Sequence, residues 1–438
     1  MLISDFTQRI LWSVRKYGLL GEKAASISYI SKSSTVFGMR WNEWCEEFKK
    51  VKEKYKEIRV YSLNACRIGE LMPKYLEAVN QSRLDEERGI LDLFVILNIH
   101  MANRRLLNIM GRNIHLINVD NIDFWIYCIK HFPRVKLWKY WNSYARRDEE
   151  NIYYPEVTAK LFKLSEIEEL EAQNKFNKMN ILSSYVCIAN RESEYFNKMG
   201  DVEGEKWHAY RNSDNEDFSS AAEYLGKHGI CTVRMGKHVK NEVDFENCID
   251  YSALFYDELM DLYLFSKCKF YLGDAHGICS LPMMMNIPVA LTNIVATFYG
   301  RQFFAYPQRD DNLYIIKKYY LRSEGRFLSI KEMAAVEKSI TEYSMHHGSG
   351  SYDYKKYEEY GIDIISNTKD EILYLAMEMN SRLEGKWIDT DEDILLRQKY
   401  NDILEEWYTT EKINRGGGNK GDCRKRIFKK QSIFAGVI

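Results

Sequence analysis

The sequence has almost no net charge, because 62 lysines and arginines stand against 63 aspartates and glutamates, which leaves −1 over 438 residues. Without an excess of positive charge, no chain-wide basic field favours nucleic acid as a partner. No run of about 18 uncharged apolar residues occurs, so the sequence predicts no membrane-spanning helix. The nine cysteines form no C-x-x-C pair, and several, such as Cys187, lie in apolar runs. We therefore expect reduced cysteines and a cytoplasmic protein.

The common cofactor, metal and nucleophile motifs are missing as well. There is no G-x-x-x-x-G-K-[ST] loop, no G-x-G-x-x-G after a strand, no G-x-S-x-G elbow and no cysteine–histidine set with zinc spacing. The acidic run Asp389–Asp393 imitates the first half of a calcium loop, but Ile394 replaces its turn glycine and Tyr400 its bidentate acid. We interpret this run as the start of a helix, where acids suit the helix dipole.

Strand-like and helical segments alternate along the chain in two series, which is typical of crossover connections in parallel sheets. The first series has strands at 58–64, 92–98 and 114–119, with helices at about 70–79 and 104–110. The second has strands at 184–190, 230–234, 269–273 and 287–293, with helices at 218–228, 256–267 and 280–286. Later helices are expected at 330–344, 368–383 and 394–407. We predict an α/β fold with two Rossmann-like, doubly wound domains, whose ligands sit beyond the carboxyl ends of the strands.

The polar segment 165–180 has weak periodicity, and we place the connection between the two domains there. The predicted limits are 1–175 for the first domain and 176–385 for the second, followed by a helix at 386–410. From 411 to 438, eight Lys and Arg stand against two Asp and Glu, so we expect a flexible basic tail. Its charge leaves two interpretations open, a solvated end or contact with anionic lipid at the inner membrane surface.

Four loops place polar groups after strands of the second series. They are Asn190–Glu192, His208–Asp214, Arg234–Lys237 and Gly273–Ser280. Three of them contain an arginine, whose planar, permanently charged fork suits phosphate oxygens. The fourth has two glycines and leads into a helix N-terminus, which favours an anion. Because all four loops fall on the same side of one predicted sheet, their side chains can converge, and the pattern predicts a diphosphate site.

Taken singly, the same residues have structural interpretations. Arg191 and Arg234 also suit surface positions at strand ends. The run Asn212–Asp214 also suits a turn followed by a helix N-cap, since these residue types favour both. A loop histidine such as His276 is more often hydrogen-bonded than catalytic.

Several segments resemble a bacterial family of glycosyltransferases associated with surface-carbohydrate gene sets. They are Y-R-N-S-D (210–214), G-I-C-T-V-R-M-G (229–236), E-L-M-D-L-Y-L-F-S-K-C-K-F-Y-L-G (258–273) and P-V-A-L-T-N (288–293). The resemblance covers about 185–293 and continues more loosely through I-S-N-T-K-D-E-I-L (365–373). R-I-G-E-L (67–71) is similar to the family's R-I-G-x-L turn, in which a histidine often takes the position of Glu70.

A more distant similarity is to GDP-fucose-dependent fucosyltransferases, whose H-x-R-x-x-D motif binds the donor diphosphate through its arginine. Here His208, Arg211 and Asp214 follow H-x-x-R-x-x-D, so only the spacing from Arg211 to Asp214 is kept. The resemblance implies a GT-B fold with an acceptor-side N-terminal domain, a donor-binding C-terminal domain and final helices that pack back on the first domain. It also implies a nucleotide-sugar donor, a glycan or lipid-linked acceptor, and no metal or other cofactor.

On this basis we predict an inverting glycosyltransferase with Glu70 as the candidate base. The predicted donor-binding residues are Arg191, Arg211, Asp214, Arg234, Gly236, Asp274, His276, Gly277 and Ser280. Two alternatives on the same fold stay open, a non-catalytic nucleotide-sugar-binding protein and a nucleotide-sugar epimerase. The donor base, the sugar and the acceptor have no fixed motif in the sequence.

Overall fold

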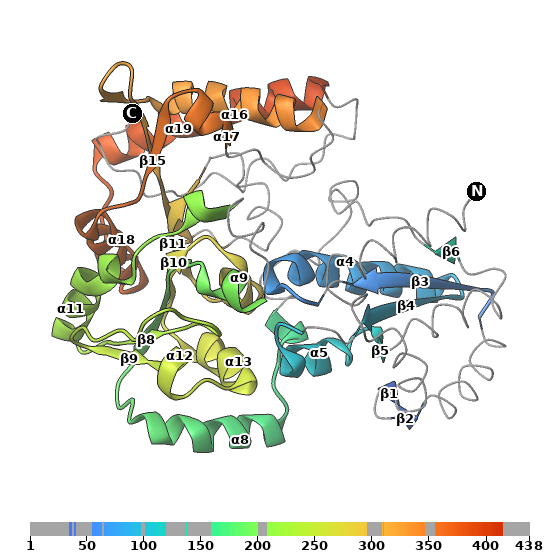
Figure 1. Cartoon of the computed structure of the whole chain (residues 1–438). Coiled ribbons are helices and arrows are strands. Elements are labelled where there is room, and N and C mark those ends of the chain that lie inside the picture. The colour runs from blue at the N-terminus through green and yellow to red at the C-terminus, as the bar shows by residue number, and fades with distance from the viewer. Residues whose placement is uncertain are drawn as a thin grey trace. The chain divides into compact units, whose positions relative to one another are not determined.

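The computed structural model describes residues 35–36, 39–40, 55–63, 65–97, 101–119, 136–137, 159–199, 208–295, 309, 311–346 and 355–414. The chain divides into two compact units, Met1–Asn142 and Ser143–Ile438, each of which carries a parallel sheet (Figure 1). Of the predicted tail at 411–438, residues 411–414 belong to the last helix, and residues 415–438 lie outside the described residues.

The N-terminal unit contains a four-stranded parallel sheet in the order β5-β4-β3-β6. Its strands are β3 (Glu57–Leu63), β4 (Ile90–Leu97), β5 (His115–Val119) and β6 (Lys136–Leu137). Helix α4 (Ile68–Glu87) connects β3 to β4, and α5 (Arg104–Met110) connects β4 to β5. A separate antiparallel pair is formed by β1 (Thr35–Val36) and β2 (Met39–Arg40). The strands predicted in this half therefore belong to one sheet with helical crossovers.

The second unit contains a six-stranded sheet in which every neighbouring pair is parallel. Its strands are β7 (Tyr185–Ala189), β8 (Cys231–Arg234), β9 (Cys248–Asp250), β10 (Tyr271–Asp274), β11 (Val289–Ile294) and β12 (Leu313–Ile316). Their spatial order is β12-β11-β10-β7-β8-β9. Counted along the chain, this is the order of the doubly wound nucleotide-binding sheet. The predicted α/β class with doubly wound parallel strands is confirmed.

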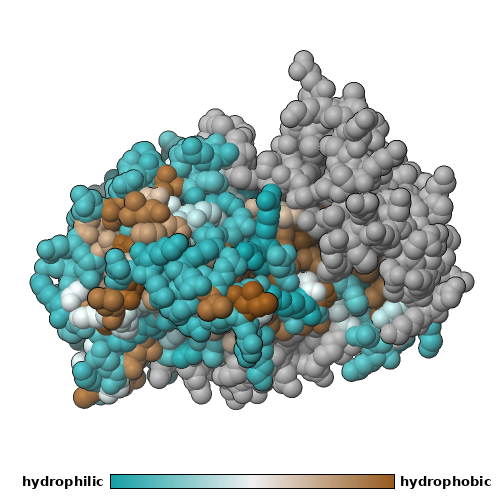
Figure 2. Space-filling view, turned by 90° about the horizontal axis from the view of Figure 1, so that it is seen from below, coloured by the Kyte–Doolittle hydropathy of each residue, from teal (hydrophilic) through white to brown (hydrophobic). Residues whose placement is uncertain are grey.

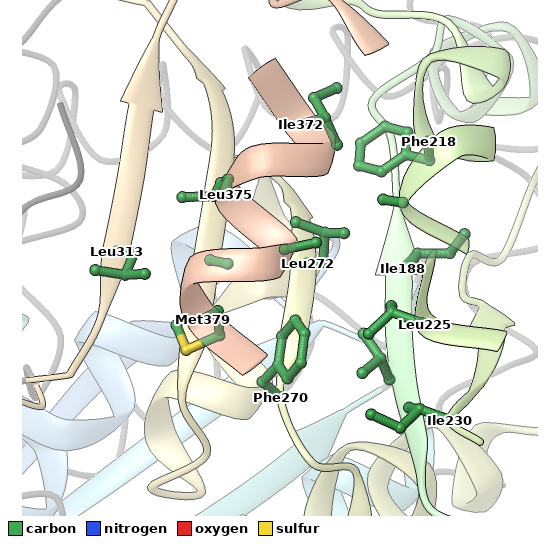
Figure 3. Packing of buried hydrophobic residues seen from close by; sticks show 14 of the residues in the cluster. Ile188, Phe218, Leu225, Ile230, Phe270, Leu272, Leu313, Ile372, Leu375 and Met379 are labelled. Atoms are coloured by element: carbon green, nitrogen blue, oxygen red, sulfur yellow. The ribbon is translucent and has the colours of Figure 1, made fainter. Parts of the chain in front are cut away.

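One face of this sheet is covered by α11 (Ser219–Lys227) and α18 (Lys369–Leu383), which lie side by side in Figure 1. Ile188 and Leu272 from the strands pack there with Leu225, Leu375 and Met379 from the helices, and all five are buried (Figure 3). Burial of such side chains stabilises the layer by roughly 1.5–3 kcal/mol each.

The opposite face is covered by α13 (Glu258–Lys267). Tyr185 Oη donates a 3.0 Å hydrogen bond to the carbonyl of Leu264, and the Tyr271 ring packs edge-on against Phe265. Successive residues of a strand point to opposite faces, so the continuous apolar runs of β7 and β10 serve both layers. Gly273 of β10 allows close packing here, since a Cβ atom would lie 2.2 Å from the Ala189 carbonyl oxygen.

A three-stranded antiparallel sheet, β14-β13-β15, follows the main sheet and was not predicted. It consists of β13 (Lys318–Leu321), β14 (Arg326–Phe327) and β15 (Ile362–Ile365), next to α16 (Ile330–His346), α17 (Lys355–Glu359) and α19 (Asp391–Asn414). Tyr319, Ile330, Tyr357 and Tyr400 are among the buried residues of its core. Tyr400 and Ile403 of the last helix, about one helical turn apart, pack in this cluster. The expected packing of that helix on the N-terminal domain stays a prediction.

The acidic run before α19 begins a helix, as predicted. Asp393 Oδ2 accepts hydrogen bonds from the backbone N–H and the hydroxyl of Thr390, and the Asp393 N–H donates to Thr390 Oγ. This reciprocal pair is a capping box, which satisfies two N–H groups at the helix start.

The polar segment expected to connect the domains forms α8 (Glu166–Phe176), a helix of the second unit. Ser165 and Glu168 form a capping box that begins it. Lys175 Nζ donates to Asp257 Oδ2 at 2.7 Å, and Tyr263 Oη donates to Gln173 Oε1 at 2.6 Å, which fix the helix beside α13. The division between units therefore comes earlier than predicted, after Asn142.

On the face seen from below, the described residues are mainly hydrophilic, with separate hydrophobic areas between the polar ones (Figure 2). Ile167 and Leu170 on α8 are among the exposed apolar residues. In the part of the chain that the structure describes, no helix is both long and apolar enough to cross a membrane. All six cysteines in the same part are free thiols.

Candidate functional site

The candidate site lies at the carboxyl ends of β7 and β10, the two central strands of the second unit's sheet. The chain leaves β7 toward β8 on one side and leaves β10 toward β11 on the other, as the strand order shows. In open α/β sheets this switch point leaves a crevice where ligands bind. Asn190 and Arg191 follow β7, and Ala275 and His276 follow β10.

Asp274, the last residue of β10, organises this end of the sheet. Its side chain is 1% exposed and accepts four hydrogen bonds. Oδ2 accepts from the Arg191 backbone N–H at 2.7 Å and from the Ser213 hydroxyl. Oδ1 accepts from Thr292 Oγ1 and Asn293 Nδ2, both at 2.8 Å. Asp274 therefore holds the loops together, and four hydrogen bonds occupy its two carboxyl oxygens.

Arg191 and Arg211 reach the site from different segments. Arg191 is buried, donates through Nη1 to the His208 carbonyl at 3.0 Å and to Asn212 Oδ1, and lies 5.2 Å from the Phe196 ring centroid. Arg211 donates through Nη2 to the Ala275 carbonyl at 2.8 Å, which joins its loop to the one after β10. The structure thus brings together two of the three predicted arginines.

The residues of the R-N-S-D element each make a different contact. Asn212 holds Arg191, and Ser213 donates to Asp274 while its backbone N–H donates to the Arg191 carbonyl at 3.1 Å. Asp214 is exposed and accepts from the Glu216 N–H at 3.0 Å, as the N-cap of the following 3-10 turn. The N-cap interpretation of Asp214 is confirmed.

Lys317, directly after β12, is a buried cation that the sequence analysis missed. It is 2% exposed, and its Nζ donates to the carbonyls of Tyr210 (3.2 Å) and Asn212 (2.6 Å) and to Ser366 Oγ (3.0 Å). Burial, opposed by Asp274 and reinforced by Arg191 and Arg211, lowers the pKa of Lys317 to about 8.

His276 lies in the same field of positive charge. Burial, with Arg191 and Arg211, lowers its pKa to about 3, so the imidazole is neutral near pH 7. Its Nε2 lies 3.4 Å from Tyr271 Oη. We call Arg191, Arg211, His276 and Lys317 the carboxyl-edge cluster.

The loop after β10 is held by more internal hydrogen bonds than the sequence suggested. Gly277–Cys279 forms a single 3-10 turn that runs into α14 (Ser280–Met284), a helix of five residues. Ser280 is 1% exposed and donates its hydroxyl proton to the Gly277 carbonyl at 2.6 Å. Its side chain therefore fixes the turn, and a ligand contact from Gly277 would come from the backbone.

Arg234 does not join the carboxyl-edge cluster, in contrast to our expectation. It is 1% exposed and donates to Asp250 Oδ2 (3.0 Å), Glu192 Oε1 (2.8 Å) and Ser252 Oγ (3.1 Å). Asp250 ends the neighbouring strand β9, which the sequence analysis did not identify, and its carboxylate neutralises the arginine. Gly236, two residues on, has φ +155°, and a Cβ atom there would lie 3.0 Å from Val239 Cγ1. Both residues therefore serve the local fold.

Glu70 lies in the N-terminal unit, in the first turn of α4. Its side chain is 45% exposed and its Oε1 lies 3.5 Å from Arg67 Nη1. An acid at this position also stabilises the helix start.

Asn293 and Asn367 complete the site and were not singled out as site residues. Each backbone N–H donates to the other's side-chain oxygen, at 2.7 and 2.8 Å, across 74 residues. Asn293 has φ +53°, a conformation that asparagine tolerates. The signal was present, because T-N at the end of the strand at 287–293 and S-N-T at 366–368 repeat the pattern of polar residues at strand ends.

Comparison with known proteins finds distant similarity among solved structures. No protein-family model matches the chain, and no curated protein sequence matches it. Among solved structures, ADP-heptose LPS heptosyltransferase II of E. coli is similar with a TM-score of 0.35 and 10% sequence identity. The similarity covers 54% of this chain and 84% of that chain. The chain is thus assigned to no family, and its function has to be inferred from the site.

Proposed function

We propose that this chain is a glycosyltransferase of the GT-B type, which moves a sugar from a nucleoside-diphosphate sugar to a surface-glycan or lipid-linked acceptor, with inversion and without a metal ion. The observation that carries the proposal is the convergence of Arg191, Arg211 and Lys317 at the switch point of a doubly wound sheet. The resemblance of the R-N-S-D and R-M-G segments to surface-carbohydrate glycosyltransferases supports the same class.

The cluster suits a diphosphate because its positive charges are crowded. Arg191 and Arg211 both lower the pKa of Lys317 and of His276, so the four groups lie within electrostatic reach of one another. Like charges held together in a partly buried place destabilise one another, and a bound dianion relieves that repulsion. Guanidinium groups also match phosphate oxygens in shape.

The same groups would act on the reaction itself. As the glycosidic bond to the diphosphate breaks, negative charge accumulates on the leaving phosphate oxygens. Fixed cations stabilise that charge more in the transition state than in the bound donor, which is the condition for rate acceleration. Arg191 and Arg211 are our candidates for this contact, with the backbone near Gly277 beside them.

A base near the acceptor hydroxyl is also needed for inversion. We keep Glu70 as the first residue to test, because its side chain is exposed at the start of α4. Glu70→Gln keeps the shape of the side chain and removes the carboxylate. If Glu70 is the base, this variant loses transfer while it still binds donor.

The proposal is tested by transfer from a panel of GDP-, UDP- and CDP-sugars to lipid-linked saccharide acceptors. Arg211→Ala is expected to abolish transfer with an unchanged circular dichroism spectrum. Arg322→Ala is the matched control, because Arg322 pairs with Asp363 on the small antiparallel sheet. Wild-type turnover in the Arg211 variant would rule out Arg211 as a contact of the donor diphosphate.

The same assay separates the alternatives. Donor binding without transfer to any acceptor would favour a binding protein. Interconversion of the nucleotide sugar without an acceptor would favour an epimerase.

A further inference from the structure

Lys317 lies where three segments of the second unit meet. It directly follows β12, and its own backbone N–H donates to the Ile294 carbonyl at the end of β11. Its Nζ donates to Tyr210 and Asn212 in one loop and to Ser366 in another. Ser366 directly precedes Asn367, whose side chain binds the backbone of Asn293. Through its backbone and its ammonium group, Lys317 therefore ties the R-N-S-D loop to the ends of β11, β12 and β15.

The two carbonyls that Lys317 binds flank Arg211 in sequence. Tyr210 and Asn212 are its immediate neighbours, so their positions determine where the Arg211 side chain starts. Asn212 also accepts from Arg191 through its side chain. Both arginines of the cluster therefore depend on a loop that Lys317 holds from the interior side.

The charge state of Lys317 decides whether all three acceptors around its Nζ receive a hydrogen bond. An ammonium group has three N–H donors, and here it has three acceptors. A neutral amine has two donors and one lone pair, so one acceptor would face a lone pair in a buried place.

We propose that Lys317 is a positioning residue that, in its charged form, closes the R-N-S-D loop and sets Arg191 and Arg211 for an anionic ligand. The ligand part of this inference rests on the proposed function, whereas the loop part does not.

The groups that face Lys317 define its pH dependence. Arg191 and Arg211 favour the neutral amine, Asp274 and Asp217 favour the ammonium, and burial lowers the pKa of Lys317 to about 8. A bound anion favours the ammonium, so anion binding takes up a proton when the pH is above that value. Anion affinity should therefore be highest below about pH 8 and fall above it.

The loop part is tested without ligand, by amide hydrogen exchange of the full chain. The reporters are the N–H groups of Asn212, bonded to the Ala209 carbonyl, and Ser213, bonded to the Arg191 carbonyl. In Lys317→Met we expect them to exchange roughly tenfold faster, because two loop carbonyls lose a charged donor. Lys318→Gln is the control, since Lys318 pairs with Glu371 instead and should leave both amides unchanged.

The pH dependence of amide protection in the wild-type protein is a second test. After correction for the intrinsic exchange rate, protection of these two amides should fall as the pH rises through about 8. Lys317→Arg, whose charge does not titrate in this range, should remove that fall. Unchanged protection in Lys317→Met, together with flat protection in wild-type protein, would overturn the proposal.

The ligand part is tested with inorganic pyrophosphate and calorimetry. Wild-type affinity should fall up to roughly tenfold per pH unit above about pH 8, and Lys317→Arg should flatten the profile. If pyrophosphate does not bind at all, the proposed function is contradicted while the exchange experiment still decides the role of Lys317. Binding of pyrophosphate with equal affinity across the pH range would contradict the proposed role of Lys317 and leave the proposed function standing.

Discussion

Glu337, on α16, is a fully buried carboxyl group whose Oε1 accepts hydrogen bonds from two tyrosines. Tyr357 Oη donates at 2.6 Å and Tyr319 Oη also donates, whereas Oε2 has no partner among the described residues. Burial, opposed by these two bonds, raises the pKa of Glu337 to about 8. The group is therefore protonated in the folded protein near pH 7 and ionised in the unfolded chain.

This shift predicts a pH-dependent stability. Because the folded pKa lies above the unfolded one, the folded state holds the extra proton between about pH 4.5 and 8. The stability contributed by the protonated group is complete below about pH 4.5 and is lost as the pH rises through about 8, at roughly 1 kcal/mol per pH unit.

Glu337→Gln keeps an acceptor for the tyrosines and removes the titration, so its urea-unfolding free energy should depend less on pH over that window. If the unfolding free energy changes equally with pH in the wild type and the variant, Glu337 does not titrate between about pH 4.5 and 8.

Residue type alone predicted some of the site and not the rest. Asp214 begins a turn because an acid at that position accepts an N–H locally, and this could be read from the sequence. Arg211 and Arg234 both lie near strand ends, but only the fold shows that Asp250 and Glu192 surround Arg234. Lys317 could not be found either, because the acceptors that hold it lie about 50 and 105 residues away.

At the scale of elements, helix α18 shows how a local cap supports the core. Thr368 and Glu371 form a capping box at its start, and Ile372, Leu375 and Met379 then pack into the main core. The S-N-T-K-D-E sequence carries this signal without any tertiary information.

Thr368→Ala should therefore reduce the free energy of unfolding by about 1 kcal/mol, since the Glu371 N–H loses its acceptor. Thr368→Ser keeps the hydroxyl and serves as the control, with a clearly smaller loss. Urea denaturation of both variants measures the difference. A loss of equal size in the two would assign the effect to the methyl group and not to the cap.

The central parallel strands were predictable because each is a short apolar run between turn residues, as in β7, β10 and β11. Strand β9 has three residues and the small antiparallel sheet has strands of two to four, too short for a periodic pattern. The polar helix α8 was misjudged for a different reason. Its partners on α13 are polar, Asp257 and Tyr263, so it shows no apolar stripe.

For the whole molecule, the α/β class and the two sheets followed from the alternation of segments, whereas the division between units did not. The unit boundary falls after Asn142, and α19 packs within the second unit through Tyr400. Both outcomes depend on long-range contacts that a periodic pattern does not encode.

The central claim is that Arg191 and Arg211 bind the diphosphate of a nucleotide without a metal ion. The direct measurement is calorimetric titration of GDP, UDP and CDP into the full chain, with and without a chelator of divalent cations. We predict that at least one nucleotide binds equally well in both conditions, and that Arg211→Ala weakens this binding by roughly ten- to hundredfold. No binding by any of the three, or unchanged binding by the Arg211 variant, would contradict the account.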